Sequence, residues 1–241
     1  SRDDVYFTPF HKTEEDTYSG PNWSSILTGV HYYKHNVVDN SFVGSRFSTY
    51  PPFQYYLELA YQEINTSSIT NWTPINTYIY QQYLDYTSES TLNDSMVFQA
   101  ASELLVDSFS APDVLFLHFD ELDAAGHSYG FSPQVSEYAN TLSKIDIFVE
   151  SLFNIIEEKR NDLGENWLFL IVSDHGGDGT GHGDAENPHI NQTIFFSQHP
   201  DLNFTPNYIT NQTDLAPTIL DYMGVASEEI DCKMDGVSII E

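Results

Sequence analysis

Two uninterrupted apolar runs limit the architectures open to this chain. The first covers Val114 to Phe119 and the second covers Trp167 to Val172, while a shorter run extends from Thr193 to Ser197. Continuous rather than alternating apolar residues predict strands that are buried on both faces, as the strands of a mostly parallel sheet are. These three segments are therefore the predicted strands.

The segment between the two long runs has the period of a helix. Apolar residues recur there at spacings of three and four, at Tyr138, Leu142, Ile145, Val149, Leu152 and Ile156, and Ser132-Pro133 precedes them as a start signal. A second helix is predicted from Thr213 to Met223, because Pro217 is tolerated in a first turn and Gly224 can end it. Strand, helix and strand in this order predict an α/β fold.

Length and charge exclude several classes of protein. With 241 residues and 40% hydrophobic content the chain can bury one core, and we expect a single domain over residues 1–241. Eight Lys and Arg residues against 36 Asp and Glu residues give a net charge of −28, which repels nucleic acid and anionic membrane surfaces. No run approaches the roughly 20 apolar residues that a membrane-spanning helix needs. The expected partner is a small molecule, not nucleic acid.

Acidic and histidine side chains gather directly after each of the two long apolar runs. The candidate metal ligands are Asp123, His127, Asp174, His175 and His182. Carboxylate oxygen and imidazole nitrogen together suit zinc or a similar first-row metal. Gly126 is expected to let the backbone turn so that Asp123 and His127 reach one ion. Because ligands bind at the carboxyl ends of strands in such sheets, we expect all five side chains to converge on one pocket.

A third group of residues lies near the start of the chain. Ser19 precedes Gly-Pro and a predicted short helix, and His35 and Asp39-Asn40 follow. The amino terminus of a helix offers free N–H groups and a positive dipole end, which suits a phosphate beside a nucleophile. Taken alone, Ser19 is more simply interpreted as a helix cap, because serine is a weak nucleophile until a base or a metal lowers its pKa.

The three groups together resemble the type I phosphodiesterases and nucleotide pyrophosphatases of the alkaline phosphatase superfamily. The segment from Ser19 to Val30 is similar to the family's nucleophile segment, and His35 to Asn40 is similar to its His-Gly-x-x-Asp-Asn motif, with Asn36 in place of the glycine. Further similar segments are Asp123–His127, Ser173–Gly176, Gly181–Gly183 and Asp214–Leu220. The motifs extend over nearly the whole chain and jointly are highly specific.

The resemblance implies a mostly parallel central sheet with helices on both faces, and two divalent metal ions. Asp123, His127 and His182 would hold one ion. Asp174 and His175 would hold the second, and zinc is the expected metal for both. The substrate would be a small phosphate ester.

The resemblance also implies the catalytic residues. Ser19 would attack phosphorus and form a phosphoseryl intermediate, and Asn40 would donate a hydrogen bond to a phosphoryl oxygen. The family's second metal takes one further Asp at the end of the first strand, and Asp3 and Asp4 follow no apolar run. We therefore expect the fold to lack its first strand here and an upstream segment of the same protein to complete the site.

Three other functions stay open. A sulfatase would need an Arg where Trp23 stands. A phosphoethanolamine transferase of the same superfamily would share the Asp-x-x-Gly-His segment, and a non-catalytic extracellular protein could retain the fold alone. Specificity in such folds depends on insertions, and residues 55–105 are the candidate insert.

Sequons favour a secreted glycoprotein or the lumen of the secretory pathway. Asn-x-Ser/Thr occurs at Asn22, Asn65, Asn71, Asn93, Asn191, Asn203 and Asn211. Asn22 falls inside the nucleophile turn, so it is expected to stay unmodified. Cys232 has no second cysteine to pair with, and it is either a small buried thiol or bonded outside this chain.

Overall fold

The computed structural model describes residues 5–81, 83–88, 90–107, 111–205, 208–226, 230 and 234–241. These residues form two compact units. Within the described part, the first unit comprises the residues up to Gln62, Leu168–Gly176 and the residues from His182 onward. The second comprises Glu63–Trp167 and Gly177–Gly181. Cys232, Asp3 and Asp4 lie outside the described residues.

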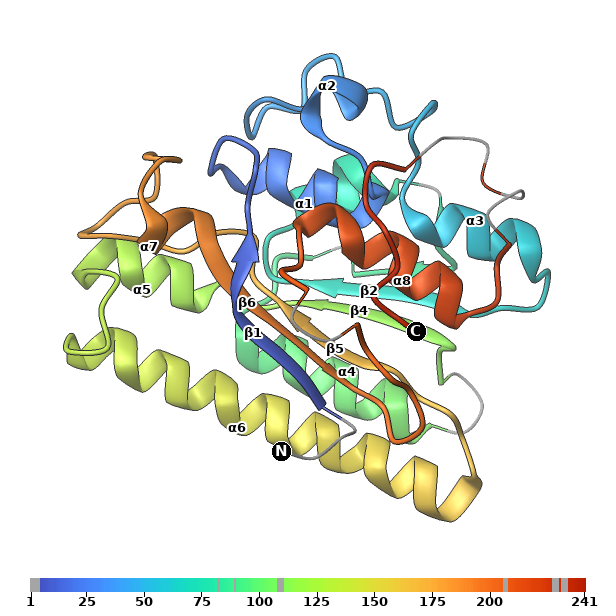
Figure 1. Ribbon diagram of the computed structural model, residues 1–241. Helices are drawn as coiled ribbons and strands as arrows, with labels where there is room; N and C mark the ends of the chain where they lie inside the picture. Colours follow the sequence, from blue (N-terminus) through green and yellow to red (C-terminus); the bar gives the residue numbers. More distant parts are fainter. Residues whose placement is uncertain are drawn as a thin grey trace. The chain divides into compact units, whose positions relative to one another are not determined.

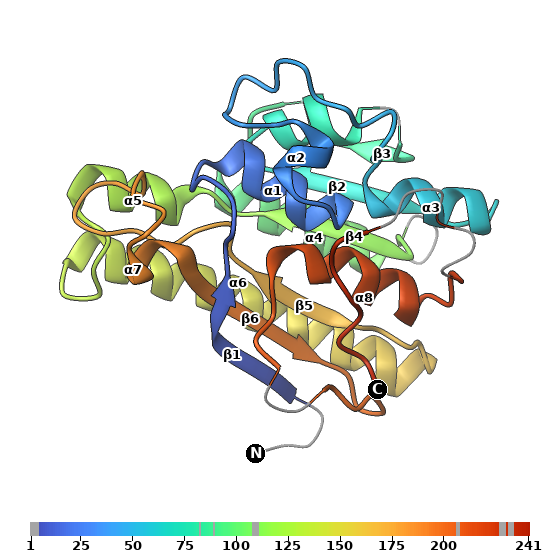
Figure 2. The same ribbon diagram turned by 45° about the horizontal axis from the view of Figure 1, so that its top comes forward.

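The first unit contains a three-stranded antiparallel sheet. Its central strand β6 (Gln192–Gln198) pairs with β1 (Val5–Lys12) on one side and with β5 (Phe169–Val172) on the other, and the three lie side by side in Figure 2. The register of β1 shifts between Thr8 and His11, where Pro9 interrupts the strand. Because proline cannot donate to a ladder, it is tolerated only at an edge or a bulge, and β1 provides both.

The first unit contains six helical segments, and the first of them begins at Ser19. They are α1 (Ser19–Thr28), α2 (Tyr32–His35), α3 (Phe53–Ala60), α7 (Pro188–Asn191), the 3₁₀ turn η3 (Gln212–Asp214) and α8 (Leu215–Tyr222). Helix α8 packs against α1 and α3. Their apolar core consists of Ile26, Leu27, Leu57, Leu220 and Ile239, all at most 1% exposed.

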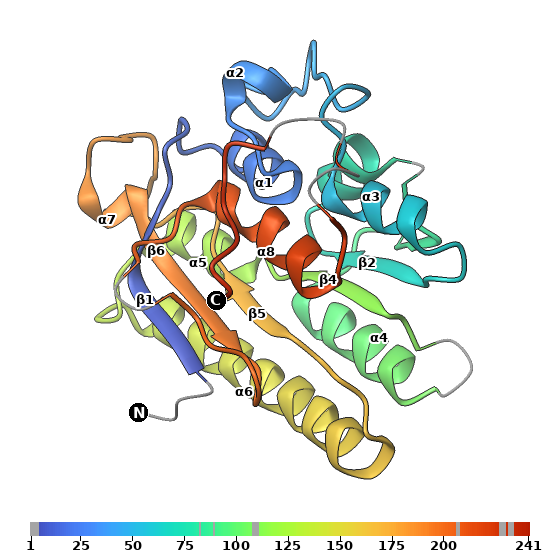
Figure 3. The same ribbon diagram turned by 45° about the vertical axis from the view of Figure 1, so that its right-hand side comes forward.

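The second unit contains a parallel sheet. Strand β2 (Thr66–Thr70) lies between β3 (Tyr86–Thr87) and β4 (Val114–His118), and every residue of β2 is buried. Helix α4 (Asp94–Val106) packs on β2 and β4 (Figure 3) and against the long helix α6 (Ser136–Glu158), which also contacts α5 (Glu121–Tyr129). Two π-helical turns, η1 (Ile75–Tyr80) and η2 (Lys159–Leu163), complete the unit.

The predicted α/β class is confirmed, with a parallel sheet and flanking helices (Figure 1). The run from Val114 forms β4, the run from Trp167 forms β5 two residues later than predicted, and the run from Thr193 forms β6. The periodic segment forms α6, and the predicted closing helix forms η3 and α8.

The pairing of β5 with β6 differs from the mostly parallel sheet that the apolar runs predicted. The ladders pair β4 with β2 and β5 with β6, so the two long apolar runs belong to different ladders, and β6 is antiparallel to both of its neighbours.

Residues 55–105, the candidate insert, include the central strand β2 and helix α4. Among the described helices, none combines the length and the apolar character needed to cross a membrane.

Candidate active site

Ser19 is the first residue of α1, and the loop that carries Asn40 fixes the turn behind it. The Gly20 N–H donates to Asn40 Oδ1 at 2.7 Å. A Cβ at Gly20 would lie 2.7 Å from the carbonyl oxygen of Asp39, so only glycine allows the loop to approach this closely. Because Oδ1 of Asn40 is used as an acceptor, its exposed Nδ2 is left to donate elsewhere.

His175 is the protein side chain that reaches Ser19. Its Nε2 lies 3.4 Å from Ser19 Oγ and 3.4 Å from Asp174 Oδ2, and its Nδ1 lies 2.9 Å from the carbonyl oxygen of Gly176. The ring is only 7% exposed. A Cβ at Gly176 would overlap the carbonyl oxygen of His189, so the glycine after His175 is required for this turn.

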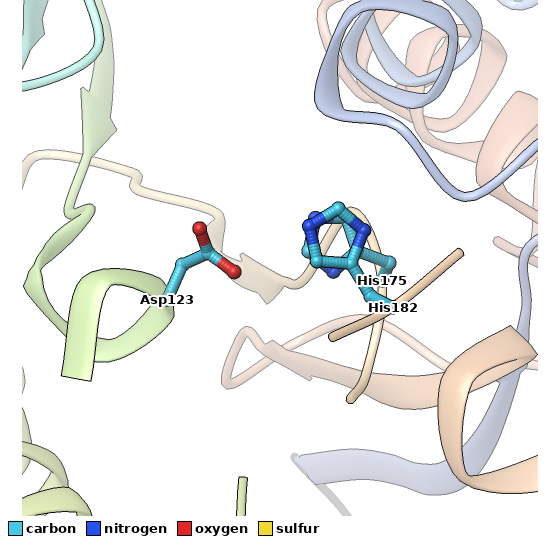
Figure 4. Close-up of side chains that lie close together, drawn as sticks. All are labelled: Asp123, His175 and His182. Carbon is cyan, nitrogen blue, oxygen red and sulfur yellow. The ribbon is translucent and has the colours of Figure 1, made fainter. Parts of the chain in front are cut away.

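His182 stacks on His175 in the same unit. The ring centroids are 3.8 Å apart and the planes differ by 18°, and Figure 4 shows the two imidazoles face to face. Two hydrogen bonds join His182 to Thr17. Nδ1 of His182 contacts the carbonyl oxygen of Thr17, and the carbonyl oxygen of His182 accepts from Thr17 Oγ1. The strand-to-helix segment before Ser19 therefore also orients His182.

Asp123 and His127 lie on α5 in the second unit. They occupy one face of the helix, four residues apart, with His127 Nε2 3.4 Å from Asp123 Oδ2, and His127 Nδ1 lies 2.9 Å from the Thr180 carbonyl oxygen. Figure 4 shows the Asp123 carboxylate projecting from α5. The expected role of Gly126 was wrong: α5 does not turn there, and the glycine makes room for the Phe131 ring, which any Cβ would overlap.

The hydrogen bonds of these three histidines are of one kind. Each Nδ1 of His127, His175 and His182 contacts a backbone carbonyl oxygen. A carbonyl oxygen can only accept, so Nδ1 carries the hydrogen and Nε2 of the neutral ring presents a lone pair. Carbonyl-bound histidines with this orientation are typical of metal ligands.

Two of those Nε2 atoms face carboxylates. The pairs are His127 with Asp123 and His175 with Asp174, each at 3.4 Å. Two acceptors at this distance repel each other unless a cation lies between or beside them, either a proton or a metal ion. The donor set, imidazole nitrogen with carboxylate oxygen, is that of zinc and related metals, so the residues fit such an ion.

Asp174 is placed by residues that the sequence analysis did not single out. Its carbonyl oxygen accepts from Thr13 Oγ1 at 3.0 Å and from Gln212 Nε2, and Gln212 Nε2 also donates to Thr13 Oγ1 at 2.8 Å. These residues come from the end of β1 and from η3. Their types carry no signal in the sequence, because threonine and glutamine are common in loops.

His35, which the motif comparison included, is structural in this fold. It is fully buried, its Nδ1 accepts from the Val37 N–H at 3.1 Å, and its Nε2 lies 3.0 Å from Ser25 Oγ. Burial lowers the pKa of His35 to about 3, so the ring is neutral. Asn36, which replaces the motif's glycine, has φ 59°, a left-handed conformation that asparagine tolerates better than most residues.

Asn22 is fully buried inside α1, and its Nδ2 donates to the carbonyl oxygens of Asp16 and Tyr18 at 3.0 and 2.7 Å. A glycan on this amide has no room, which agrees with the expectation for this sequon. Asn71 Nδ2 likewise donates to Asp94 Oδ1 at 2.8 Å.

Comparison with known proteins identifies relatives with several activities. Bis(5'-adenosyl)-triphosphatase ENPP4 of Homo sapiens is 29% identical over 180 residues, which are 65% of this chain and 37% of that protein. GPI ethanolamine phosphate transferase 1 of Aspergillus fumigatus is 29% identical over 168 residues, 64% of this chain and 15% of that protein. The matched part of this chain thus spans well under half the length of either relative.

Solved structures share the fold at low identity. Murine ectonucleotide pyrophosphatase / phosphodiesterase 5 superposes with a TM-score of 0.72 at 13% identity, over 98% of this chain and 91% of that one. A 2-O GAG sulfatase gives a TM-score of 0.73 at 12% identity, over 99% of this chain and 66% of that one. The family model for type I phosphodiesterase / nucleotide pyrophosphatase matches residues 9–203. The chain therefore belongs to the type I phosphodiesterase / nucleotide pyrophosphatase family of the alkaline phosphatase superfamily.

Proposed function

We propose that this chain is a metal-dependent hydrolase of small phosphate esters, with a preference for phosphodiesters or pyrophosphates. The observation that carries the proposal is the common orientation of His127, His175 and His182. In each ring Nδ1 contacts a backbone carbonyl oxygen, which leaves Nε2 as the atom that can bind a metal ion. Family membership supports the same activity.

Two divalent ions are proposed, with the ligands divided as the motifs imply. Asp123, His127 and His182 hold one, and Asp174 and His175 hold the other beside Ser19. When bound, such a pair neutralises charge on the attacking and leaving oxygens and lowers the pKa of the nucleophile. The convergence of the two ligand groups on one pocket stays a prediction.

Ser19 is proposed as the nucleophile. It lies at the amino terminus of α1, where N–H groups and the helix dipole stabilise a phosphoryl group, and its Oγ is 3.4 Å from His175 Nε2. Attack of Oγ on phosphorus expels the leaving alcohol or phosphate and gives a phosphoseryl chain, which water then hydrolyses. Asn40 Nδ2 donates to a phosphoryl oxygen while its Oδ1 holds the Gly20 N–H.

A second candidate is transfer rather than hydrolysis. The similarity to GPI ethanolamine phosphate transferase 1 favours it. The two reactions share attack by Ser19 and differ only in whether an alcohol or water takes the phosphoryl group. They are distinguished by supplying a phosphodiester together with an alcohol acceptor and measuring the ratio of the new diester, formed by transfer, to the phosphate monoester, formed by hydrolysis.

The test compares three substrates on one zinc-loaded preparation: bis-p-nitrophenyl phosphate, p-nitrophenyl phosphate and p-nitrophenyl sulfate. We expect turnover to be fastest for the diester and absent for the sulfate. In Ser19→Ala, turnover should fall by at least about a thousandfold, the scale of losing a nucleophile, while zinc content stays unchanged. Undiminished turnover in Ser19→Ala would show that Ser19 is not the nucleophile.

A secretory route is proposed from the sequons. Asn203 is exposed and offers an accessible amide, whereas Asn22 is fully buried and Asn71 is hydrogen bonded. Expression in a glycosylating cell followed by endoglycosidase treatment should give a mass shift that Asn203→Gln reduces. A shift that persists unchanged in Asn203→Gln and disappears in Asn22→Gln would contradict this assignment.

A further inference from the structure

Asp94 is a fully buried carboxylate at the first residue of α4. Burial removes water from the charged group and raises the pKa of Asp94. Such a group is costly to bury unless hydrogen bonds replace its hydration. The partners that replace the water therefore indicate what Asp94 does.

Those partners lie on the loops that follow two neighbouring strands. Asp94 Oδ1 accepts from Asn71 Nδ2 at 2.8 Å and from the Asp120 N–H at 2.9 Å. Its Oδ2 accepts from the Glu121 N–H at 3.1 Å. Asn71 directly follows β2, and Asp120 and Glu121 begin α5 just after β4. Two of the three donors thus belong to the start of α5.

The amino terminus of α5 receives no capping hydrogen bond from the side chain of its own N-cap residue, Asp120. The first N–H groups of a helix need an acceptor, and a negative charge at that end is favoured by the helix dipole. Asp94, which lies on α4, supplies both the acceptor and the negative charge to the amino terminus of α5.

We propose that Asp94 is a positioning residue for the metal ligands of α5. Its carboxylate fixes the amino terminus of the helix and thereby sets where Asp123, in the first turn, and His127, four residues later, present their ligand atoms. The proposal rests on the proposed function, since it assumes that those two residues hold a metal ion. Loss of a partner that orients metal ligands typically weakens metal affinity by about 10- to 100-fold.

The first test measures the zinc affinity of the full chain by competition with a chromophoric chelator. Asp94→Asn keeps the size of the side chain but removes its charge, and in either amide orientation an N–H₂ group faces an N–H of Asp120 or of Glu121, so zinc affinity should fall at least about tenfold. Glu103→Gln removes one charge from an exposed position of the same helix and should leave the affinity unchanged. Wild-type affinity in a folded Asp94→Asn would overturn the proposal.

A second test needs no metal. In chelator-treated protein, amide hydrogen exchange at Asp120 and Glu121 should be slow in the wild type and at least about tenfold faster in Asp94→Asn, with the amides of β4 unchanged. Fast exchange at both positions in the wild type would overturn the proposal. Should Asp94→Asn fail to fold, Asp94→Ser, which keeps one acceptor, takes its place under the same criteria.

The outcomes separate this proposal from the proposed function. If wild type and Asp123→Ala bind zinc equally, the metal site is wrong whatever Asp94 does. If Asp123→Ala loses zinc while Asp94→Asn keeps it, the metal site stands and the role of Asp94 is wrong. Asn71→Ala, which leaves both bonds to α5 in place, should bind zinc like the wild type.

Discussion

Asn40 combines an observed structural contact with a proposed role toward the substrate. Its Oδ1 accepts from the Gly20 N–H, and the direction of that bond assigns the amide so that Nδ2 is the outward donor. Neither the contact nor the proposed role could be supplied by an aliphatic residue. With the amide in this orientation, Nδ2 is available for the proposed hydrogen bond to substrate, and this proposal can be tested separately from the contact with Gly20.

Asn40→Asp is the matched change at this position. The carboxylate still accepts from the Gly20 N–H, so the turn before α1 and the unfolding midpoint should be unchanged. The donor is lost and a negative charge faces the phosphoryl group, so kcat should fall by about 10²- to 10³-fold, the range for removing one such donor. Steady-state kinetics on bis-p-nitrophenyl phosphate measures it, and an unchanged kcat would remove Asn40 from the reaction.

At the scale of elements, helix α5, which carries two of the proposed metal ligands, packs closely against the ring of Phe131. Phe131 lies against both Gly126 and Gly177, and a Cβ at either glycine would overlap it. Its ring also meets the His127 ring edge to face, with centroids 5.4 Å apart. The position of Phe131 thus couples the packing of α5 to one of the proposed ligands.

Gly126→Ala should therefore destabilise the protein even though alanine favours helices by about 1 kcal/mol over glycine. Overpacking of this kind costs roughly 1–3 kcal/mol, which exceeds the gain in propensity. Denaturant unfolding measures the difference. Gly181→Ala is the control, because no atom lies within 4 Å of its Cβ position, and it should be neutral. A stabilised Gly126→Ala would show that Phe131 does not occupy this space.

The elements that the sequence predicted are those with a strong periodic or apolar signal. β4, β5, β6, α6 and α8 all begin within two or three residues of their predicted starts. Strand β1 was missed because Pro9 and polar residues interrupt its pattern, and the ladder to β6 overrides that local signal. The buried strand β2, with sequence TSSIT, carries few apolar residues, so burial did not show in its composition.

For the candidate site, motifs predicted the residue types but not their supports. The sequence indicated Ser19 and the five proposed metal ligands through their positions after strands and before a helix. It gave no sign of Thr17, Gln212 or Asp94, which act through a few hydrogen bonds to segments that are distant in the chain. Such contacts depend on tertiary structure alone.

At the scale of the whole molecule, two buried neutral histidines make stability depend on pH. His11 and His35 are both fully buried, and burial lowers the pKa of each to about 3. The unfolded chain has ordinary histidines, with pKa values near 6.5. Below that value the unfolded state binds more protons than the folded state, so stability falls as the pH falls from about 6.5 towards 3.

The size of this pH dependence follows from the number of protons that each histidine takes up on unfolding. Each such histidine should cost about 1.4 kcal/mol per pH unit well below pH 6.5. Urea unfolding of chelator-treated protein between pH 7 and pH 4 measures this slope. His11→Gln removes one titrating group and should make the dependence shallower than in the wild type. Equal slopes in the two proteins would show that His11 is accessible to protons in the folded state.

The most direct test of metal-dependent phosphoester hydrolysis is the turnover of bis-p-nitrophenyl phosphate before chelation, after chelation and after return of zinc. The geometry of His127, His175 and His182 predicts that chelation abolishes turnover and that zinc restores it. Asp123→Ala should lack turnover in all three states. Turnover that survives complete removal of metal, or its absence from a fully zinc-loaded protein, would contradict the proposed function.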